Sequence, residues 1–193
     1  MDPQAPARAQ VLQHADRSVT EEAADILAQG LVAHVAFSID GQPFVIPFTY
    51  HFDRSAPNRL YLHGSPTSRA LRHLASGAPV CVEVSLLDGL VYSRTALYHS
   101  MNYRSAVCFG RARLVEDEAR KRAVFEKMIS RYFAGRSAPR DYEAPSAEHL
   151  GGTALLELRI EEMSAKARSG GPKGPRDQDP EAPGTAGVID LSR

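Results

Sequence analysis

Residues 60–74 read Leu-Tyr-Leu-His-Gly-Ser-Pro-Thr-Ser-Arg-Ala-Leu-Arg-His-Leu, a short apolar strand that runs into a helix through a junction rich in hydroxyl groups. The first amides of a helix have no partner within it and lie at the positive end of its dipole, so Ser68 and Arg69 would complete a phosphate site there. Capping of the helix by Thr67 or Ser68, with Arg69 solvated, is the alternative, and the local residues alone favour it. Evidence from the rest of the sequence is needed to choose between a phosphate site and helix capping.

Length and charge exclude several classes of protein. The 193 residues suffice for one domain with a full core. Acidic and basic side chains balance at 23 each, and the arginines are dispersed, so we expect no binding to nucleic acid. No stretch approaches the ~20 apolar residues of a membrane span, and the N-terminus lacks the apolar region of an export signal. We therefore expect a cytoplasmic protein that binds no membrane.

Common cofactor and metal motifs are absent from the sequence. Cys81 and Cys108 lie within apolar runs and lack the spacing of metal ligands, so we expect buried, reduced thiols and no metal site. The G-x-G-x-x-G, Walker, CxxC and H-E-x-x-H patterns do not occur either. A dinucleotide-binding fold, a P-loop and a zincin are thus each without support.

Composition divides the chain into three parts. Residues 1–17 are polar and without period, which predicts an N-terminal arm. Residues 18–168 carry the regular patterns of one domain. From 169 to 187, nine of nineteen residues are glycine or proline, so the tail 169–193 is expected to be extended or disordered. Its residues 188–191 are apolar enough to dock as a short edge segment.

The order of the predicted elements favours a mainly β protein with flanking helices. Strict strand-helix alternation is missing, so a small barrel of antiparallel strands fits better than a doubly wound sheet. The alternating charges of Arg120 to Lys127 predict a solvated helix face. The predicted strands are 31–39 and 42–52 around an Asp40-Gly41 turn, then 60–63, 79–86, 104–115 and 153–160, and the predicted helices are 18–29, 68–75 and 117–133.

Five segments carry a family resemblance that covers residues 18–168. They are Gln42-Pro-Phe-Val-Ile-Pro-Phe-Thr-Tyr50, Leu60-Tyr-Leu-His-Gly64, Ser68-Arg69, Tyr103-Arg-Ser-Ala-Val-Cys-Phe-Gly-Arg-Ala112 and Ser164-Ala-Lys-Ala-Arg168. In this order they resemble the pyridoxamine 5′-phosphate oxidase-like flavoproteins. Within that superfamily, the sequence is most similar to the small flavin-nucleotide-binding proteins that include the nitroimidazole-resistance (Nim) reductases. Five ordered segments are far more specific than any one of them.

The resemblance implies an antiparallel split β-barrel that forms a homodimer, with two FMN molecules at the subunit interface. It therefore favours phosphate binding at Ser68 and Arg69. The residues that it assigns to FMN are Val45, Ile46, Pro47, Phe48, Thr49 and Tyr50 beside the ring, His63 and Gly64 beside the ribityl chain, Ser68 and Arg69 at the phosphate, and Ser105, Lys166 and Arg168 from later strands.

The sequence departs from the vitamin-making oxidases in two respects. Ala70 stands where they carry a lysine, which leaves the phosphate one cation short, and the chain has no tryptophan. The C-terminal substrate signature of those oxidases is missing as well. Oxidation of pyridoxine phosphate is therefore not expected.

The leading hypothesis is an FMN-dependent oxidoreductase that takes hydride from a reduced nicotinamide and reduces a small electrophile, such as a nitro compound or a quinone. No residue stands out as a necessary general acid or base, and His63 is the one candidate for a catalytic role. A flavin carrier without turnover is an alternative. A haem-binding protein on the same barrel is another, with His63 or His99 as the iron ligand. The sequence does not separate FMN from a deazaflavin.

Overall fold

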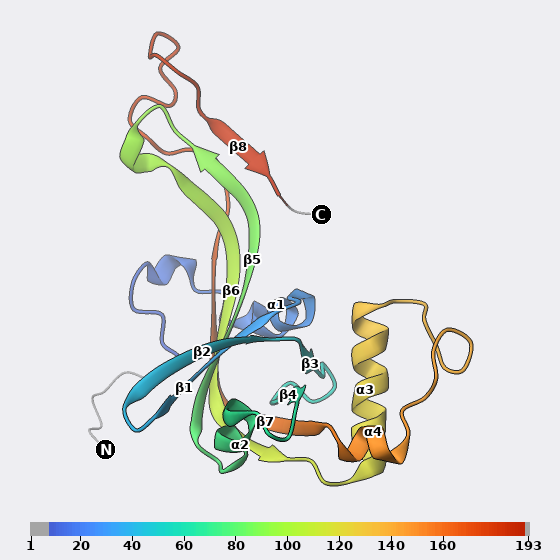
Figure 1. The fold of residues 1–193 in the computed structure, drawn as a ribbon. Helices are drawn as coiled ribbons and strands as arrows, with labels where there is room; N and C mark the ends of the chain where they lie inside the picture. Colours follow the sequence, from blue (N-terminus) through green and yellow to red (C-terminus); the bar gives the residue numbers. More distant parts are fainter. Residues whose placement is uncertain (1–7, 192–193) are drawn as a thin grey trace.

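The computed structural model describes residues 8–191, whose strands form one antiparallel sheet (Figure 1). The strands are β1 (Ala33–Ile39), β2 (Gln42–Phe48), β3 (Tyr50–Phe52), β4 (Arg59–Gly64), β5 (Pro79–Tyr92), β6 (Ser100–Leu114), β7 (Ala154–Arg168) and β8 (Gly187–Asp190). The helices are α1 (Ala23–Gln29), α2 (Arg69–Ala75), α3 (Glu118–Tyr132) and α4 (Ala147–Gly151), with single 3-10 turns at Ala15–Arg17, Thr20–Glu22 and Ala96–Tyr98.

The sheet is a split barrel. Its strand order is β2-β1-β5-β6-β7-β4-β3, so β2 and β3 lie at opposite ends although only Thr49 separates them in the chain. The sheet must therefore curl until its two edges meet at Thr49, where no ladder joins them. The predicted antiparallel split barrel is confirmed. The prediction of one continuous strand over 42–52 is wrong, because all three β3 residues are buried and give no alternation to mark the break.

The β1–β2 hairpin forms as its turn predicts. Asp40 and Gly41 have φ values of 50° and 80°, and both turn positions of a type I′ hairpin require a positive φ. The turn sets a register that places Phe37 opposite Phe44, with ring centroids 5.5 Å apart. The first strand begins at Ala33 rather than at residue 31, because Leu31 is exposed.

The core lies inside the curled sheet. Each of five neighbouring strands contributes fully buried side chains to it, and examples are Val35, Val82, Cys108, Leu158 and Leu62. Small residues on the inner face of β6, as the alternation predicts, let the sheet curl tightly around them.

A β-bulge joins β6 to β7. The register shifts between Phe109 and Gly110, which leaves Glu161 as the extra residue on β7. A Cβ atom on Gly110 would lie 2.0 Å from the Arg159 carbonyl oxygen, so only glycine allows this approach of the two backbones.

Two strands run beyond the barrel as an arm, which we define as Leu87–Tyr103 together with β8. Strands β5 and β6 are longer than the sequence predicts, and they project away from the body (Figure 1). Strand β8 pairs with Gly89–Tyr92, which confirms that the end of the tail docks as an edge segment. At the base of the arm, Arg104 makes a bidentate contact with Asp88, at 2.9 and 2.7 Å.

Helix α3 covers the outer face of β4 and β7. Its N-cap is Asp117, whose carboxylate accepts from Arg120 N at 2.7 Å. The prediction of a solvated charged face is wrong for its first turns. Arg120 bonds to the buried Glu157, and Arg122 donates to the Pro145 carbonyl oxygen at 2.6 Å. These side chains tie the helix to β7 and to the loop before α4, a short helix that the sequence pattern did not reveal.

The segments outside the domain are partly docked. Arg8 pairs with Glu161 and Glu162, and Lys166 Nζ donates to the Gln13 carbonyl oxygen. The first predicted helix is shorter than 18–29, because Thr20–Glu22 forms a 3-10 turn without a side-chain cap. Residues 1–7 of the predicted N-terminal segment and residues 192–193 of the tail lie outside the described residues. Within residues 8–191, no helix has the length and apolar character needed to cross a membrane.

Candidate functional site

The junction between β4 and α2 leaves one arginine free. Ser68 is the N-cap of α2, and its Oγ accepts from Leu71 N at 3.4 Å, so the capping interpretation is confirmed. Arg69 is exposed and makes no ion pair within residues 8–191. Its guanidinium carbon lies 4.2 Å from the centre of the Phe44 ring on β2. Capping therefore does not exclude ligand binding, because it occupies Ser68 and not Arg69.

Two further hydroxyl groups lie in the turn just before Arg69. Ser65 Oγ and Thr67 Oγ1 are 2.7 Å apart, and Thr67 N donates to Ser65 Oγ at 3.2 Å. Both residues are exposed. The sequence pattern indicates Thr67 only as a cap and does not single out Ser65, although both precede the helix. Together with Arg69 they form a set of donors suited to a phosphate.

The free edge of β2 offers a single backbone donor along residues 43–47. Strand β2 pairs only with β1, so alternate backbone groups point away from the sheet. Pro43 and Pro47 have no N–H and therefore occupy the outward positions. By the two-residue alternation, the Val45 N–H also points outward, between the two prolines. Val45 is 63% exposed and lies on an edge that no other strand pairs with, so a ligand can reach this N–H.

The other predicted residues of this segment are divided between the edge and the core. Ile46 and Phe48 pack against the core, while Pro47 is exposed. Tyr50 lies in β3 and is fully buried, and its hydroxyl donates to the Leu27 carbonyl oxygen at 2.6 Å. Burial raises the pKa of Tyr50 to about 12. Tyr50 is therefore placed as a core residue rather than beside a ligand.

His63 points away from the barrel interior, into a mostly apolar cavity of about 520 Å³ beneath α3 and α4. Its ring meets Phe125 edge-on, with centroids 5.6 Å apart. The buried Nδ1 atom has no hydrogen-bond partner, and burial lowers the pKa of His63 below its ordinary value. The imidazole is therefore neutral near pH 7. Gly64 follows directly and lies against Leu71 of α2.

Two residues share this cavity with His63 without having been placed there by the sequence pattern. Thr49, at the gap of the barrel, lines it, and so does His149 on α4. Ser146 caps α4 by accepting from His149 N at 3.1 Å. A serine at this position is the sequence signal that could have indicated the start of α4. The second predicted haem ligand, His99, lies instead at the arm, where its Nδ1 is 3.0 Å from the Ala96 carbonyl oxygen.

The remaining predicted residues lie on β6 and β7, in the middle of the strand order. Ser105 Oγ donates to the Lys166 carbonyl oxygen at 3.3 Å. Arg168 donates to Asn102 Oδ1 at 2.5 Å. Within one protomer these side chains hydrogen-bond to neighbouring segments, whereas the Arg69 side chain makes no hydrogen bond or ion pair within residues 8–191.

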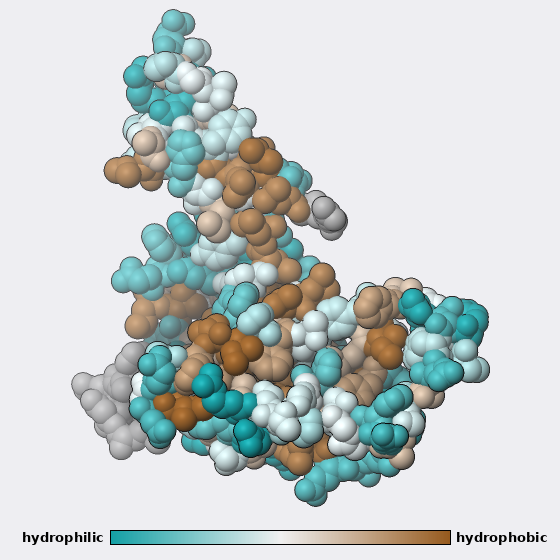
Figure 2. Space-filling view, in the orientation of Figure 1, coloured by the Kyte–Doolittle hydropathy of each residue, from teal (hydrophilic) through white to brown (hydrophobic). Residues whose placement is uncertain are grey.

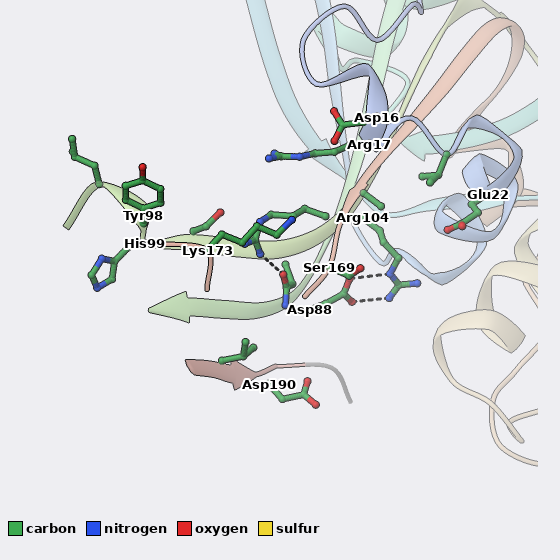
Figure 3. Close-up of a pocket in the computed structure, with 17 residues that line it drawn as sticks. Asp16, Arg17, Glu22, Asp88, Tyr98, His99, Arg104, Ser169, Lys173 and Asp190 are labelled. Carbon is green, nitrogen blue, oxygen red and sulfur yellow. Dashed lines mark hydrogen bonds and ion pairs between the residues drawn. The ribbon is translucent and has the colours of Figure 1, made fainter. Parts of the chain in front are cut away.

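A wider cavity, of about 1030 Å³, lies at the base of the arm (Figure 3). Arg168 lines it, and Figure 3 shows the Arg104–Asp88 ion pair at its wall. Its cations and carboxylates are equal in number, since Arg17, Arg104, Arg168 and Lys173 face Asp16, Glu22, Asp88 and Asp190. This balance gives the cavity no preference for an anionic ligand.

Fold and sequence together define the class as split-barrel proteins. The sequence model of the family described as pyridoxamine 5′-phosphate oxidase matches residues 20–167, and the chain belongs to this family.

Two solved structures match over most of their length. The FAD and haem binding protein from Mycobacterium smegmatis is 34% identical, with 91% of this chain and 84% of that one covered and a TM-score of 0.80. The flavocytochrome Anf3 from Azotobacter vinelandii is 32% identical, with 97% and 86% covered and a TM-score of 0.80.

A third structure shares the fold alone. It is a proposed 5-nitroimidazole antibiotic resistance protein from Bacteroides thetaiotaomicron, 23% identical, with 76% of this chain and 82% of that one covered and a TM-score of 0.63. Comparison with curated protein sequences gave no match.

Proposed function

We propose that the chain is a flavin-binding oxidoreductase that holds the FMN moiety between the edge of β2 and the start of α2. The observation that carries the proposal is the position of Arg69, exposed, unpaired and lying over Phe44 of β2. A guanidinium binds phosphate bidentately, and the hydroxyls of Ser65 and Thr67 supply further donors. The two relatives above 30% identity, one an FAD and haem binding protein and the other a flavocytochrome, support the same ligand class.

The FMN moiety also occurs within FAD. The family resemblance implies FMN, whereas the Mycobacterium smegmatis relative binds FAD. Both cofactors present the same ribityl phosphate to Arg69 and the same ring edge to the Val45 N–H. Chromatography of the cofactor released from purified protein distinguishes FMN, FAD and a deazaflavin. Protein that purifies without any of them and takes up none in titration contradicts the proposal.

A bound flavin would supply the hydride and electron chemistry. The chain would bind the phosphate through Arg69, orient the ring through Val45 N–H, and exclude water with the apolar side chains of β2. We propose a reduced nicotinamide as electron donor and a small electrophile, such as a nitro compound or quinone, as acceptor. Bleaching of the flavin spectrum by reduced nicotinamide supports an enzyme. Flavin that stays oxidised supports a carrier instead.

A second cofactor is favoured by the cavity beneath α3. It is mostly apolar, it holds a neutral imidazole with a free Nδ1 atom on His63, and His149 lines it as well, which fits the requirements of a haem. His63 would ligate the iron. Titration of the protein with hemin should give a Soret band, and His63→Ala should abolish it. His99→Ala serves as the matched control and should leave the band unchanged.

We also propose that the protein is a cytoplasmic homodimer. Leu90, Met101 and Ile189 lie directly opposite one another on the three strands of the arm and are 42–52% exposed. Figure 2 shows apolar side chains gathered on the arm beside β8. An exposed apolar row of this kind is typical of an interface between subunits. A second copy would also bring Ser105, Lys166 and Arg168 toward a flavin, as the family resemblance implies. Cys81 and Cys108 are free thiols, which fits a reducing compartment.

A further inference from the structure

Three arginines face one another across three neighbouring strands. Arg159 of β7 is directly opposite Arg59 of β4 on one side and directly opposite Arg111 of β6 on the other. All three emerge from the outer face of the sheet, and all three are exposed. Like charges in directly opposite positions destabilise a sheet, so this row requires a counter-charge.

The carboxylates nearby do not supply that counter-charge fully. Arg59 reaches Glu157 only at 3.7 Å, and Arg111 reaches Glu161 only at 3.7 Å. Arg159, in the middle of the row, makes no ion pair or side-chain hydrogen bond within residues 8–191. The central charge is therefore unpaired although it has a cation on each side.

Both glutamates are already bound by other groups. Glu157 is buried, with a side chain 4% exposed, and it accepts from Arg113 at 2.9 Å, from Tyr61 OH at 2.9 Å and from Arg120. Burial alone would raise its pKa, but these donors hold the pKa below its usual value. Glu161 pairs at 2.9 Å with Arg8. Neither carboxylate can turn toward Arg159 without losing a shorter contact.

The row borders a cleft of about 570 Å³, which we call the arginine cleft. Four arginines (59, 111, 113 and 159) and two glutamates line it, an excess of two positive charges. The volume lies within the range of small-molecule pockets, about 300–1,000 Å³. None of the lining residues belongs to β2, α2, α3 or the arm, so the cleft is separate from the sites described above.

We propose that the arginine cleft binds a small molecule that carries a diphosphate group. Guanidinium forks match phosphate oxygens bidentately, and adjacent strands lie about 4.8 Å apart. A diphosphate carries two phosphoryl groups, so it can extend along the row and pair with Arg159 together with a neighbouring arginine. Nucleoside diphosphates belong to this chemical class.

Calorimetric titration of the full-length protein with inorganic pyrophosphate, at constant ionic strength, tests the proposal. Arg159→Gln removes the unpaired charge and should raise the dissociation constant for pyrophosphate at least about tenfold. Arg176→Gln is the matched control, since Arg176 pairs with Asp179 in the tail and does not line the cleft. Arg69→Ala should keep the wild-type affinity for pyrophosphate, which separates this cleft from the proposed flavin phosphate site.

Thermal unfolding gives a second readout that a purely structural arginine would not produce. Without ligand, Arg159→Gln should raise the Tm, because the charge of Arg159 no longer repels those of Arg59 and Arg111. At the same concentration, pyrophosphate should raise the Tm of the wild type more than that of the variant. Equal affinities of wild type and Arg159→Gln, or a lower Tm of the unliganded variant, would overturn the proposal. So would sulfate that binds as tightly as pyrophosphate.

Discussion

The phenolic oxygen of Tyr132 lies 3.0 Å from the backbone nitrogen of Tyr50 and accepts its hydrogen bond. The same oxygen is 2.8 Å from the Leu31 carbonyl oxygen, which can take its proton. Arg131 beside it donates to the Tyr50 carbonyl oxygen at 2.9 Å. The last turn of α3 therefore binds the backbone of β3 at the place where the barrel is split. This contact replaces the strand pairing that the open edge lacks.

Tyr132→Phe should consequently destabilise the fold. It removes the acceptor of a backbone N–H, and a buried donor left unsatisfied costs about 1–3 kcal/mol. We expect the free energy of unfolding, measured in urea, to fall by that amount. Tyr98→Phe, on the exposed arm, serves as the control and should leave it within about 0.5 kcal/mol. Equal stability of the two variants would show that water satisfies the Tyr50 N–H.

Arg69→Ala should weaken flavin binding far more than folding. The guanidinium is exposed and contacts the Phe44 ring without an ion pair or hydrogen bond in the described residues, whereas a charge-assisted bond to phosphate contributes about 1.5–3 kcal/mol. We expect a dissociation constant roughly ten to a hundred times higher in a fluorescence titration. Arg69→Lys should be intermediate, because lysine keeps the charge and loses the planar fork. Arg72→Ala on the same helix is the control, and unchanged binding by Arg69→Ala would contradict the proposed phosphate site.

Val45→Pro tests the backbone donor on the free edge of β2. Proline removes the outward N–H, while the bonds to β1 come from the neighbouring residues and should persist. One neutral hydrogen bond is worth about 0.5–1.5 kcal/mol, so flavin affinity should fall about two- to tenfold. Val45→Ala changes the side chain and keeps the N–H, and it should bind flavin like the wild type. If the two variants bind alike, the ring does not use this donor.

Acid should destabilise the protein through two buried histidines. Burial lowers the pKa of His63, and burial also lowers that of His51, where Arg131 and Lys127 add to the effect and Asp53 opposes it. Below about pH 6.5 the unfolded chain binds protons that these folded imidazoles do not. The free energy of unfolding therefore decreases as the pH is lowered.

The two histidines can be separated by substitution. Each contributes a slope of at most about 1.4 kcal/mol per pH unit. His63→Gln should therefore flatten the dependence of unfolding free energy on pH between 7.5 and 5.5, as measured by urea titration at each pH. His99→Gln, at an exposed position on the arm, is the control. An unchanged slope in His63→Gln would mean that His63 becomes protonated in the folded protein as readily as in the unfolded chain.

The apolar row of the arm should govern association. Ile189→Lys places a charge opposite Leu90, and burying that charge in an interface would be unfavourable. We expect light scattering to report a dimer for the wild type and a monomer for Ile189→Lys. Thr185→Lys, in the tail before β8, controls for added charge. Light scattering that reports a monomer for the wild type would contradict the proposed dimer.

Several parts of the structure could be predicted from local sequence alone. The Asp40-Gly41 turn specifies its hairpin because it provides positive φ at both central residues, and Asp117 and Ser68 mark the starts of α3 and α2 because their side chains cap free amides. Arg69 was also identifiable, since it follows an N-cap. These signals act over a few residues and need no partner from elsewhere in the chain.

Other features exist only because distant segments meet. The periodicity of residues 42–52 does not reveal that Thr49 separates strands at opposite ends of the sheet, since that depends on the pairing of β3 with β4. In the same way, His63 and His149 share a cavity only after α3 has packed over β4.

The arginine row shows most clearly the difference between what local sequence determines and what long-range pairing determines. Arg59, Arg111 and Arg159 are ordinary charged residues of three separate strands in the sequence. The sequence by itself determined which side of each strand carries the charge, because side chains alternate with a period of two. Only the tertiary structure decided that the three charges stand in one row, because register across a sheet is set by long-range pairing and by the bulge at Gly110.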